Sequence, residues 1–109
     1  MRRVVVTGMG AVTPIGNSVS EFYEGIKEGR CGVAPITHYD TADSKVTLAA
    51  EVKDFDATSF LSPSQLRKLD DFVVFALAAA KEAFEDSKLD MNTEDAGRCG
   101  VLVSSGIGG

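Results

Sequence analysis

A glycine-rich turn after a buried strand is where many enzymes bind a nucleotide phosphate, and the chain begins with such a stretch, VVVTGMGAVTPIG at residues 4–16. A dinucleotide-binding fingerprint requires G-x-G-x-x-G, with a helix beginning inside the motif. Gly8 and Gly10 fit, but Thr13 occupies the third glycine position, and Pro14 disfavours a helical conformation at Thr13. The stretch also lacks the G-K-[ST] of a phosphate-binding loop. We therefore expect a strand that ends in a turn with close backbone packing, and not a nucleotide site.

Residues that could act as nucleophiles or metal ligands are few and far apart. Cys31 and Cys99 form no C-x-x-C pair, and His38 is the only histidine. These spacings exclude a zinc cluster and a disulfide framework, although a single bridge between the two cysteines stays open. We expect Cys31 to be a loop or core-edge thiol, Cys99 to be a small apolar residue at the start of a strand, and His38 to be a surface or hydrogen-bonding loop residue.

The composition is that of a small globular chain, with 109 residues, 44% hydrophobic and 25% charged. A formal net charge of −5 argues against general binding to nucleic acid or to an anionic membrane, which would need a basic face. The basic start is followed by too short an apolar run for a signal peptide, and the longest apolar run, residues 72–80, falls short of the ~20 residues that span a bilayer. We expect a cytoplasmic protein with no nucleic-acid or membrane partner.

Strand-like and helix-like segments alternate along the chain, which is typical of the α/β class. The three consecutive valines within residues 3–7 predict a fully buried strand, because they leave no polar face. Residues 46–52 are predicted to be extended, with only partial alternation. Residues 100–103 predict a short apolar strand that leads into SSGIGG.

The first helix is marked by its capping residues. Ser18 predicts the N-cap of a helix over residues 19–28, and Glu21 stands three residues later, where a capping box requires it. Gly29 suits the left-handed position after the last turn.

A second helix start is predicted at residues 62–65, where a serine cap is followed by proline at the first helical position and by glutamine for a capping box. A long helix then runs from near residue 70 to residue 87. Its nine successive apolar residues, 72–80, cover every side of the helix and predict burial all round. A lone domain of this size rarely supplies that cover, so we expect the opening portion of a larger protein. A small domain completed by dimerisation is the alternative.

Four ordered segments carry a resemblance to a known family: VVVTGMGAVTPIGN at the start, KDFDATSFLS at residues 53–62, RKLDDF at residues 67–72 and VLVSSGIGG at the end. Together they resemble the N-terminal part of the β-ketoacyl-acyl carrier protein synthase II family of thiolase-like condensing enzymes. The resemblance implies that residues 1–109 are an incomplete, N-terminal part of a ketoacyl synthase domain. It also implies a five-layer αβαβα fold, of which this chain supplies part of the N-terminal half.

The activity that the resemblance implies is fatty acid elongation, in which a cysteine takes the acyl chain and malonyl-acyl carrier protein is decarboxylated to attack it. The family's cysteine lies in a T-A-C-A type of elbow, whereas Cys31 and Cys99 both lie in GRCGV. No catalytic residue is therefore expected in this chain, and the isolated chain should be inactive. The expected partners are acyl carrier protein, acyl and malonyl thioesters and a second copy in a homodimer, with no cofactor and no metal.

Two groups of binding residues are carried over by the resemblance. Ile107, flanked by Gly106 and Gly108, would line the far part of the acyl pocket and gate chain length, and a plain loop anchor is the alternative. Arg67 and Lys68 would meet the acidic helix of the carrier protein. The alternative for this pair is a solvated helix end, with Arg67 pairing to one of the two aspartates that follow.

Other readings of the whole protein also stay open. The first is a polyketide-type ketosynthase, and the second is a nonenzymatic chain-length factor that keeps the fold without the cysteine. One local departure bears on the fold: the family commonly has glycine where this chain has Lys88, and lysine is costly in a left-handed cap. We therefore expect a different turn at that point.

Overall fold

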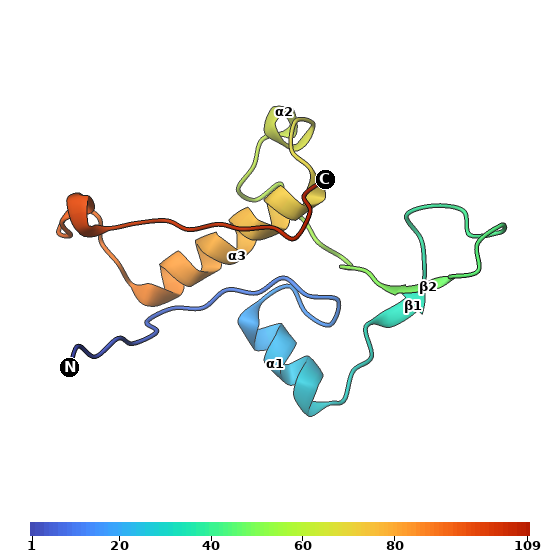
Figure 1. Cartoon of the computed structure of the whole chain (residues 1–109), viewed down its shortest axis with the longest axis horizontal. Helices are drawn as coiled ribbons and strands as arrows, with labels where there is room; N and C mark the ends of the chain where they lie inside the picture. The colour runs from blue at the N-terminus through green and yellow to red at the C-terminus, as the bar shows by residue number, and fades with distance from the viewer. The chain divides into compact units, whose positions relative to one another are not determined.

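The computed structural model describes residues 1–109, which form two compact units. One unit contains residues 1–10 and 57–109, and the other contains residues 11–56. The elements along the chain are α1 (Val19–Lys27), β1 (Val33–Pro35), β2 (Leu48–Ala50), α2 (Pro63–Leu66), α3 (Asp71–Ser87) and the 3-10 turn η1 (Ala96–Arg98), as labelled in part in Figure 1.

The unit over residues 11–56 begins with a closed turn at residues 13–16. The backbone N–H of Thr13 donates to the carbonyl of Gly16 at 2.8 Å, and the N–H of Gly16 donates back at 3.2 Å. The Thr13 hydroxyl donates to the same Gly16 carbonyl at 2.9 Å and accepts from the Ile15 N–H at 3.3 Å. These bonds close the turn on itself, and the expected turn is confirmed.

Helix α1 confirms the predicted helix to within one residue at its end. The Ser18 hydroxyl accepts from the Glu21 N–H at 3.1 Å, as an N-cap should. The second half of the capping box is shifted, because the Glu21 carboxylate accepts from the N–H of Asn17 at 2.8 Å and not from that of Ser18. Gly29 has a φ of +68°, which confirms the left-handed residue after the helix.

Strands β1 and β2 pair antiparallel, with Val33 opposite Ala50 and Pro35 opposite Leu48. The predicted extended segment over residues 46–52 is therefore confirmed for its central residues. The sequence did not reveal β1, because a three-residue strand that ends in proline has no readable alternation.

A carboxylate closes the loop between the two strands. Both oxygens of Glu51 accept from the Thr37 backbone N–H at 3.1 Å, and one of them accepts from the Thr37 hydroxyl at 2.8 Å. The N–H of His38 donates to the other oxygen at 3.3 Å, and only 14% of the Glu51 side chain is exposed. Partial burial alone would raise the pKa of Glu51, but the bonds from Thr37, the bond from His38 and the nearby imidazole outweigh it and lower that pKa.

The other unit is built on α3, which confirms the predicted long helix. Ahead of it, α2 begins with a complete capping box, in which the Gln65 N–H donates to the Ser62 hydroxyl at 3.3 Å and the Ser62 N–H donates to the Gln65 side chain at 2.9 Å. At the far end of α3, Lys88 has a φ of +59°, so our expectation of a different turn was wrong. Lysine takes the left-handed cap itself, with its N–H bonded to the Glu85 carbonyl at 3.3 Å.

Two glycines let the N-terminal segment lie directly on α3. A Cβ placed on Gly8 would overlap the carbonyl oxygen of Ala83, and one placed on Gly10 would overlap that of Ala79, one helical turn earlier. Between the two glycines, the Met9 N–H donates to the Asp86 carboxylate at 3.1 Å. The first glycines of the opening stretch therefore serve close packing, as predicted, and the structure shows that their partner is a helix.

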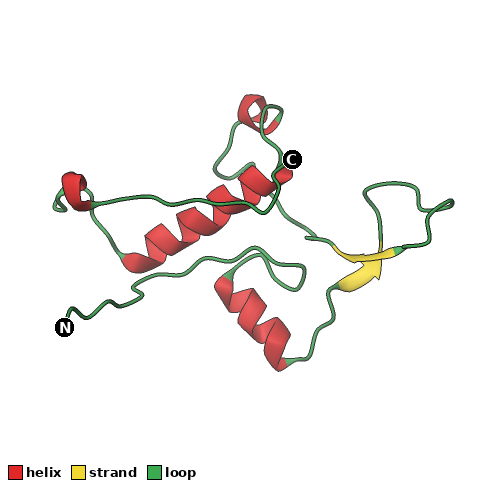
Figure 2. Ribbon diagram, viewed as in Figure 1, coloured by secondary structure: helices red, strands yellow, loops and turns green.

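Neither outer strand predicted from the sequence forms. Residues 8–10 and 99–105 run alongside α3, and the N-terminus extends past the C-terminal end of that helix (Figure 1). No other segment of the chain pairs with residues 1–10 or 99–105, and both are drawn as loops in Figure 2. Their side chains are open to solvent, as for Val4 at 92% and Leu102 at 96% exposed. High β propensity alone does not make a strand, because a strand also needs the backbone donors and acceptors of a neighbour.

The predicted burial of α3 on all sides is also not found in the described chain. Val74 is 5% exposed and is the one buried residue of the helix, while Phe72 and Leu77 are 38% and 42% exposed. The helix is covered along one side by the N-terminal segment and along another by residues 101–105. The apolar run is wider than these two extended segments can cover.

The contact between Gly10 and α3 predicts a stability effect of one methyl group. Gly10→Ala places that methyl against the backbone of Ala79, which cannot move aside alone, so the protein should lose roughly 1–3 kcal/mol of its free energy of unfolding. Urea unfolding followed by circular dichroism measures this loss. Gly100→Ala is the matched control, because no heavy atom lies within 4 Å of its added methyl. Equal urea midpoints of unfolding for Gly10→Ala and Gly100→Ala would contradict the close packing of Gly10 on α3.

The Glu51 bonds predict a pH dependence. A folded-state pKa below the ordinary value of 4.5 means that Glu51 stabilises the fold fully above that value, and that this contribution declines as the pH falls through the lower folded-state pKa. Thr37→Val removes the hydroxyl donor and should raise the pKa of Glu51, as measured by carboxyl-carbon NMR titration. Thr41→Val, in the same loop, is the control and should leave the pKa of Glu51 unchanged. If the pKa of Glu51 in Thr37→Val equalled that of the wild type, the Thr37 hydroxyl would not stabilise the Glu51 carboxylate.

Candidate functional site

The two predicted carrier-docking cations lie at the corner between α2 and α3. Arg67 is the C-cap of α2, and its N–H donates to the Pro63 carbonyl at 3.2 Å, while the Lys68 N–H donates to the Gln65 carbonyl at 2.9 Å. Both residues are exposed. The capping box and Pro63 restrain the short helix that directly precedes them, so these cations project from a defined backbone.

Neither cation is used in an internal ion pair. The ion pairs of the described chain join Lys27 to Glu24, Arg30 to Glu28, Lys81 to Glu85 and His38 to Glu51. The alternative in which Arg67 pairs with one of the aspartates that follow is therefore not what the structure has. Both charges remain available to a partner.

The glycine-flanked loop at residues 106–109 carries the predicted acyl-pocket residues. Ile107 is fully exposed, and no heavy atom lies within 4 Å of a Cβ placed on Gly106. Gly108 has a φ of +94°, a conformation that an L side chain rarely adopts. The isoleucine thus stands on a backbone that can change its dihedrals, and it is not among the residues that line the apolar cavity beside this loop.

The sequence did not reveal an apolar cavity of about 480 Å³ beside this loop. The helix side of the cavity follows the i, i+4, i+5 spacing of one face of α3, which was hidden in a run that is apolar in every direction. Two serines of the C-terminal segment border it. Its lining is Phe72, Val73, Ala76, Leu77 and Ala80 from α3, with Val101, Val103, Ser104 and Ser105.

A second, polar cavity of about 490 Å³ lies in the unit over residues 11–56. Its cations are engaged by the backbone, since Arg30 donates to the Ile15 carbonyl at 2.9 Å and Lys53 donates to the Gly32 carbonyl at 2.8 Å. The Asn17 amide donates to the Lys53 carbonyl at 2.7 Å. These bonds connect the turn, α1 and the segment after β2, which is a structural role.

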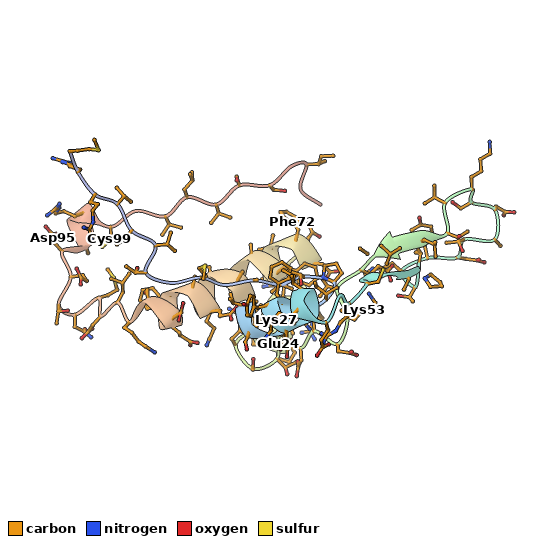
Figure 3. The ribbon with its side chains drawn as sticks, turned by 90° about the horizontal axis from the view of Figure 1, so that it is seen from below. Glu24, Lys27, Lys53, Phe72, Asp95 and Cys99 are labelled. Carbon is orange, nitrogen blue, oxygen red and sulfur yellow. The ribbon has the colours of Figure 1, made fainter.

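The thiols of the two cysteines have backbone carbonyls as their hydrogen-bond partners. Cys31 and Cys99 are free and exposed, so they form no bridge with each other, and Cys99 neither starts a strand nor packs as an apolar residue. The Cys99 thiol lies 3.5 Å from the Asp95 carbonyl, and the two residues, labelled in Figure 3, flank η1. His38 is a hydrogen-bonding loop residue, as predicted, with its Nε2 3.8 Å from the Glu51 carboxylate.

No three side chains among histidine, cysteine, aspartate and glutamate come together as metal ligands. None of the helices has both the length and the apolar character needed to cross a bilayer.

Comparison with solved structures places the fold among ketosynthases. The ishigamide ketosynthase/chain length factor superposes on 84% of this chain with a TM-score of 0.75 and 36% sequence identity, and 23% of its own chain is covered. A type II polyketide ketosynthase, solved in complex with its acyl carrier protein, superposes on 87% of this chain with a TM-score of 0.63 and 28% identity, again over 23% of its own chain.

Comparison with known sequences gives the same family. The 3-oxoacyl-[acyl-carrier-protein] synthase 2 of Synechocystis sp. is 47% identical over 108 residues, which are 99% of this chain and 26% of that protein. The chain therefore spans about a quarter of the length of this relative. The family described as the N-terminal domain of β-ketoacyl synthase matches residues 1–109 in full. By this match over its whole length, the chain belongs to the β-ketoacyl synthase N-terminal domain family.

Proposed function

We propose that the protein containing this chain is a 3-oxoacyl-[acyl-carrier-protein] synthase, an acyltransferase that elongates fatty acids. The observation that carries the proposal is the 47% identity, over 99% of this chain, to a synthase of that name. Segments that resemble the family lie at both ends and in the middle of the chain, so the likeness does not depend on one motif.

The proposed reaction has two bond-forming steps. The acyl group first moves from the thiol of the carrier protein to a cysteine thiol. Malonyl-carrier protein then loses carbon dioxide, and the resulting carbanion attacks the acyl thioester and expels the cysteine thiolate, while hydrogen-bond donors stabilise the oxyanion. Neither cysteine of this chain lies in the family's elbow or beside a base, so the chain contributes binding and positioning.

In this proposal the α2 corner docks the carrier protein. Arg67 and Lys68 are exposed, free of ion pairs and placed at the C-terminal end of a capped helix, which suits an acidic partner surface. A related ketosynthase has been solved with its acyl carrier protein bound, which supports a carrier protein as the partner. Exposed charges of this kind favour rapid and correctly oriented encounter more than tight binding.

The glycine loop is proposed as part of the acyl pocket. Ile107 would stand at the far part of the pocket, and Gly106 and Gly108 would let it move aside for a long chain. The exposed isoleucine and the positive φ of Gly108 support this role.

The same proposal covers the architecture of the whole protein. A five-layer thiolase-like fold would supply strand neighbours for residues 3–7 and 100–103 and a cover for the apolar sides of α3, all of which are exposed here. We also propose that residues 1–109 are one part of a ketoacyl synthase domain in a cytoplasmic homodimer. Gel filtration and cell fractionation would test the last two points.

A polyketide ketosynthase, or a chain-length factor without the cysteine, is the second candidate. Both structural neighbours come from such systems, which is the observation in its favour. A cysteine in a T-A-C-A type of elbow elsewhere in the gene product would exclude the nonenzymatic candidate. A preference for saturated acyl over polyketide primers would then exclude the other one.

The activity itself is the first test. The purified gene product that contains this chain should condense acyl- and malonyl-carrier protein with release of carbon dioxide, as measured by mass spectrometry of the carrier-bound product. A cysteine alkylator should abolish the reaction, and the isolated 109 residues should show none. A folded gene product without condensation, or a reaction that is resistant to alkylation, would refute the proposed function.

The docking corner gives a second prediction. Arg67→Glu with Lys68→Glu should raise the KM for carrier protein about tenfold and flatten its dependence on salt, with little change in kcat. The matched control is Lys88→Glu with Arg98→Glu, which reverses two exposed charges outside the α2 corner. If the two double variants raise the KM by the same factor, the cause is the change in net charge, and the proposal that the carrier protein docks at this corner is wrong.

A further inference from the structure

The glycine loop rests on the first turn of α3. A Cβ placed on Gly108 would lie 3.7 Å from Cζ of Phe72, and one placed on Gly109 would lie 3.0 Å from Cε1 of the same ring. Figure 3 labels Phe72 on this helix, and Figure 1 shows the C-terminal end of the chain beside the start of α3. The backbone of the loop thus lies close to the edge of the Phe72 ring.

The residue at the N-cap of α3 adds a second contact at the same corner. Asp70 occupies the N-cap position, where an aspartate ordinarily accepts a bond from a helix amide, yet its side chain makes no such bond. A Cβ placed on Gly109 would instead lie 2.7 Å from Oδ2 of Asp70. The start of α3 therefore bounds the loop with both the carboxylate and the ring.

Phe72 is placed between the loop and the apolar cavity. Its side chain lines that cavity together with Ser104 and Ser105, which immediately precede the loop. Gly106 has no neighbour within 4 Å of an added Cβ, and Ile107 is fully exposed. Within the described chain, Phe72 is thus the apolar side chain on which the loop rests.

We propose that Phe72 is a positioning residue for chain-length selectivity, acting through Ile107. The inference rests on the proposed function, in which Ile107 must move aside when a long acyl chain enters. A rigid ring under Gly108 resists that movement, because the loop backbone must lift from it or slide along it. Removal of the ring leaves the glycines free to change their dihedrals. The kcat/KM for long acyl chains should therefore rise, whereas that for short chains should not.

The test is Phe72→Ala in the whole active protein. We expect the ratio of kcat/KM for a long acyl-carrier primer to that for a short one to rise about tenfold, with the KM for malonyl-carrier protein unchanged. Phe72→Tyr keeps the ring and should keep the wild-type ratio, whereas Phe72→Leu should shift it partway. Phe84→Ala, at the other end of α3, is the control and should leave the ratio unchanged.

A double-mutant cycle tests the route through the isoleucine. In an Ile107→Ala background the gate is already open, so adding Phe72→Ala should not change the ratio further. Additive effects would overturn the route, and an unchanged ratio in folded Phe72→Ala would overturn the role of the ring. If Phe72→Ala fails to fold, the role of the ring is overturned instead by equal long-to-short ratios of kcat/KM in Phe72→Leu and Phe72→Tyr. A wild-type protein without condensation would refute the proposed function, which separates that failure from failure of this inference.

Discussion

The close approach of a glycine backbone to a helix is the constraint on which the larger of the two units depends. Gly8 and Gly10 lie against the carbonyls of Ala83 and Ala79, so neither residue has room for a Cβ. The small alanines on α3 make the matching surface, and the bond from Met9 to Asp86 fixes the direction of the segment. Because van der Waals attraction falls off steeply with distance, this contact would be lost if either surface carried a larger side chain. A stretch that resembles a phosphate-binding motif is thus used for packing.

The same helix organises the functional end of the unit. Its first turn follows directly after the capped α2 corner, where Arg67 and Lys68 are free to meet a partner, and it carries Phe72 beneath the glycine loop. Docking and selectivity would therefore share one short stretch of chain, residues 62–72, in the proposed enzyme. The exposed sides of α3 and the unpaired valine segments lie elsewhere on the unit, where the proposed five-layer fold would place further chain.

The candidate site could be predicted from the sequence only in part. The positions of the cations and of the glycine-flanked Ile107 came from a resemblance of ordered segments, and the structure shows both exposed. The apolar cavity and the support by Phe72 could not be predicted. In a run that is apolar on every side, no periodicity distinguishes the residues that face a cavity from those that face a strand. The contact of Gly108 with Phe72 joins residues 36 positions apart, which no local pattern encodes.

Local chemistry determined the helices from the sequence alone. Ser18, Ser62 and Gly29 mark helix ends through bonds and dihedrals that involve only neighbouring residues, so α1 and α2 formed where they were predicted. Helix α3 also formed where it was predicted, although the side chain of its N-cap, Asp70, makes no capping bond. Lys88 is the exception, because the chain takes a left-handed cap even without glycine. Tertiary structure decided which extended segments became strands. Strands β1 and β2 exist because they pair with each other, whereas the valine-rich segments at residues 3–7 and 100–103 remain unpaired. A helix satisfies its backbone hydrogen bonds within itself, but a strand depends on a neighbour that its own sequence does not specify.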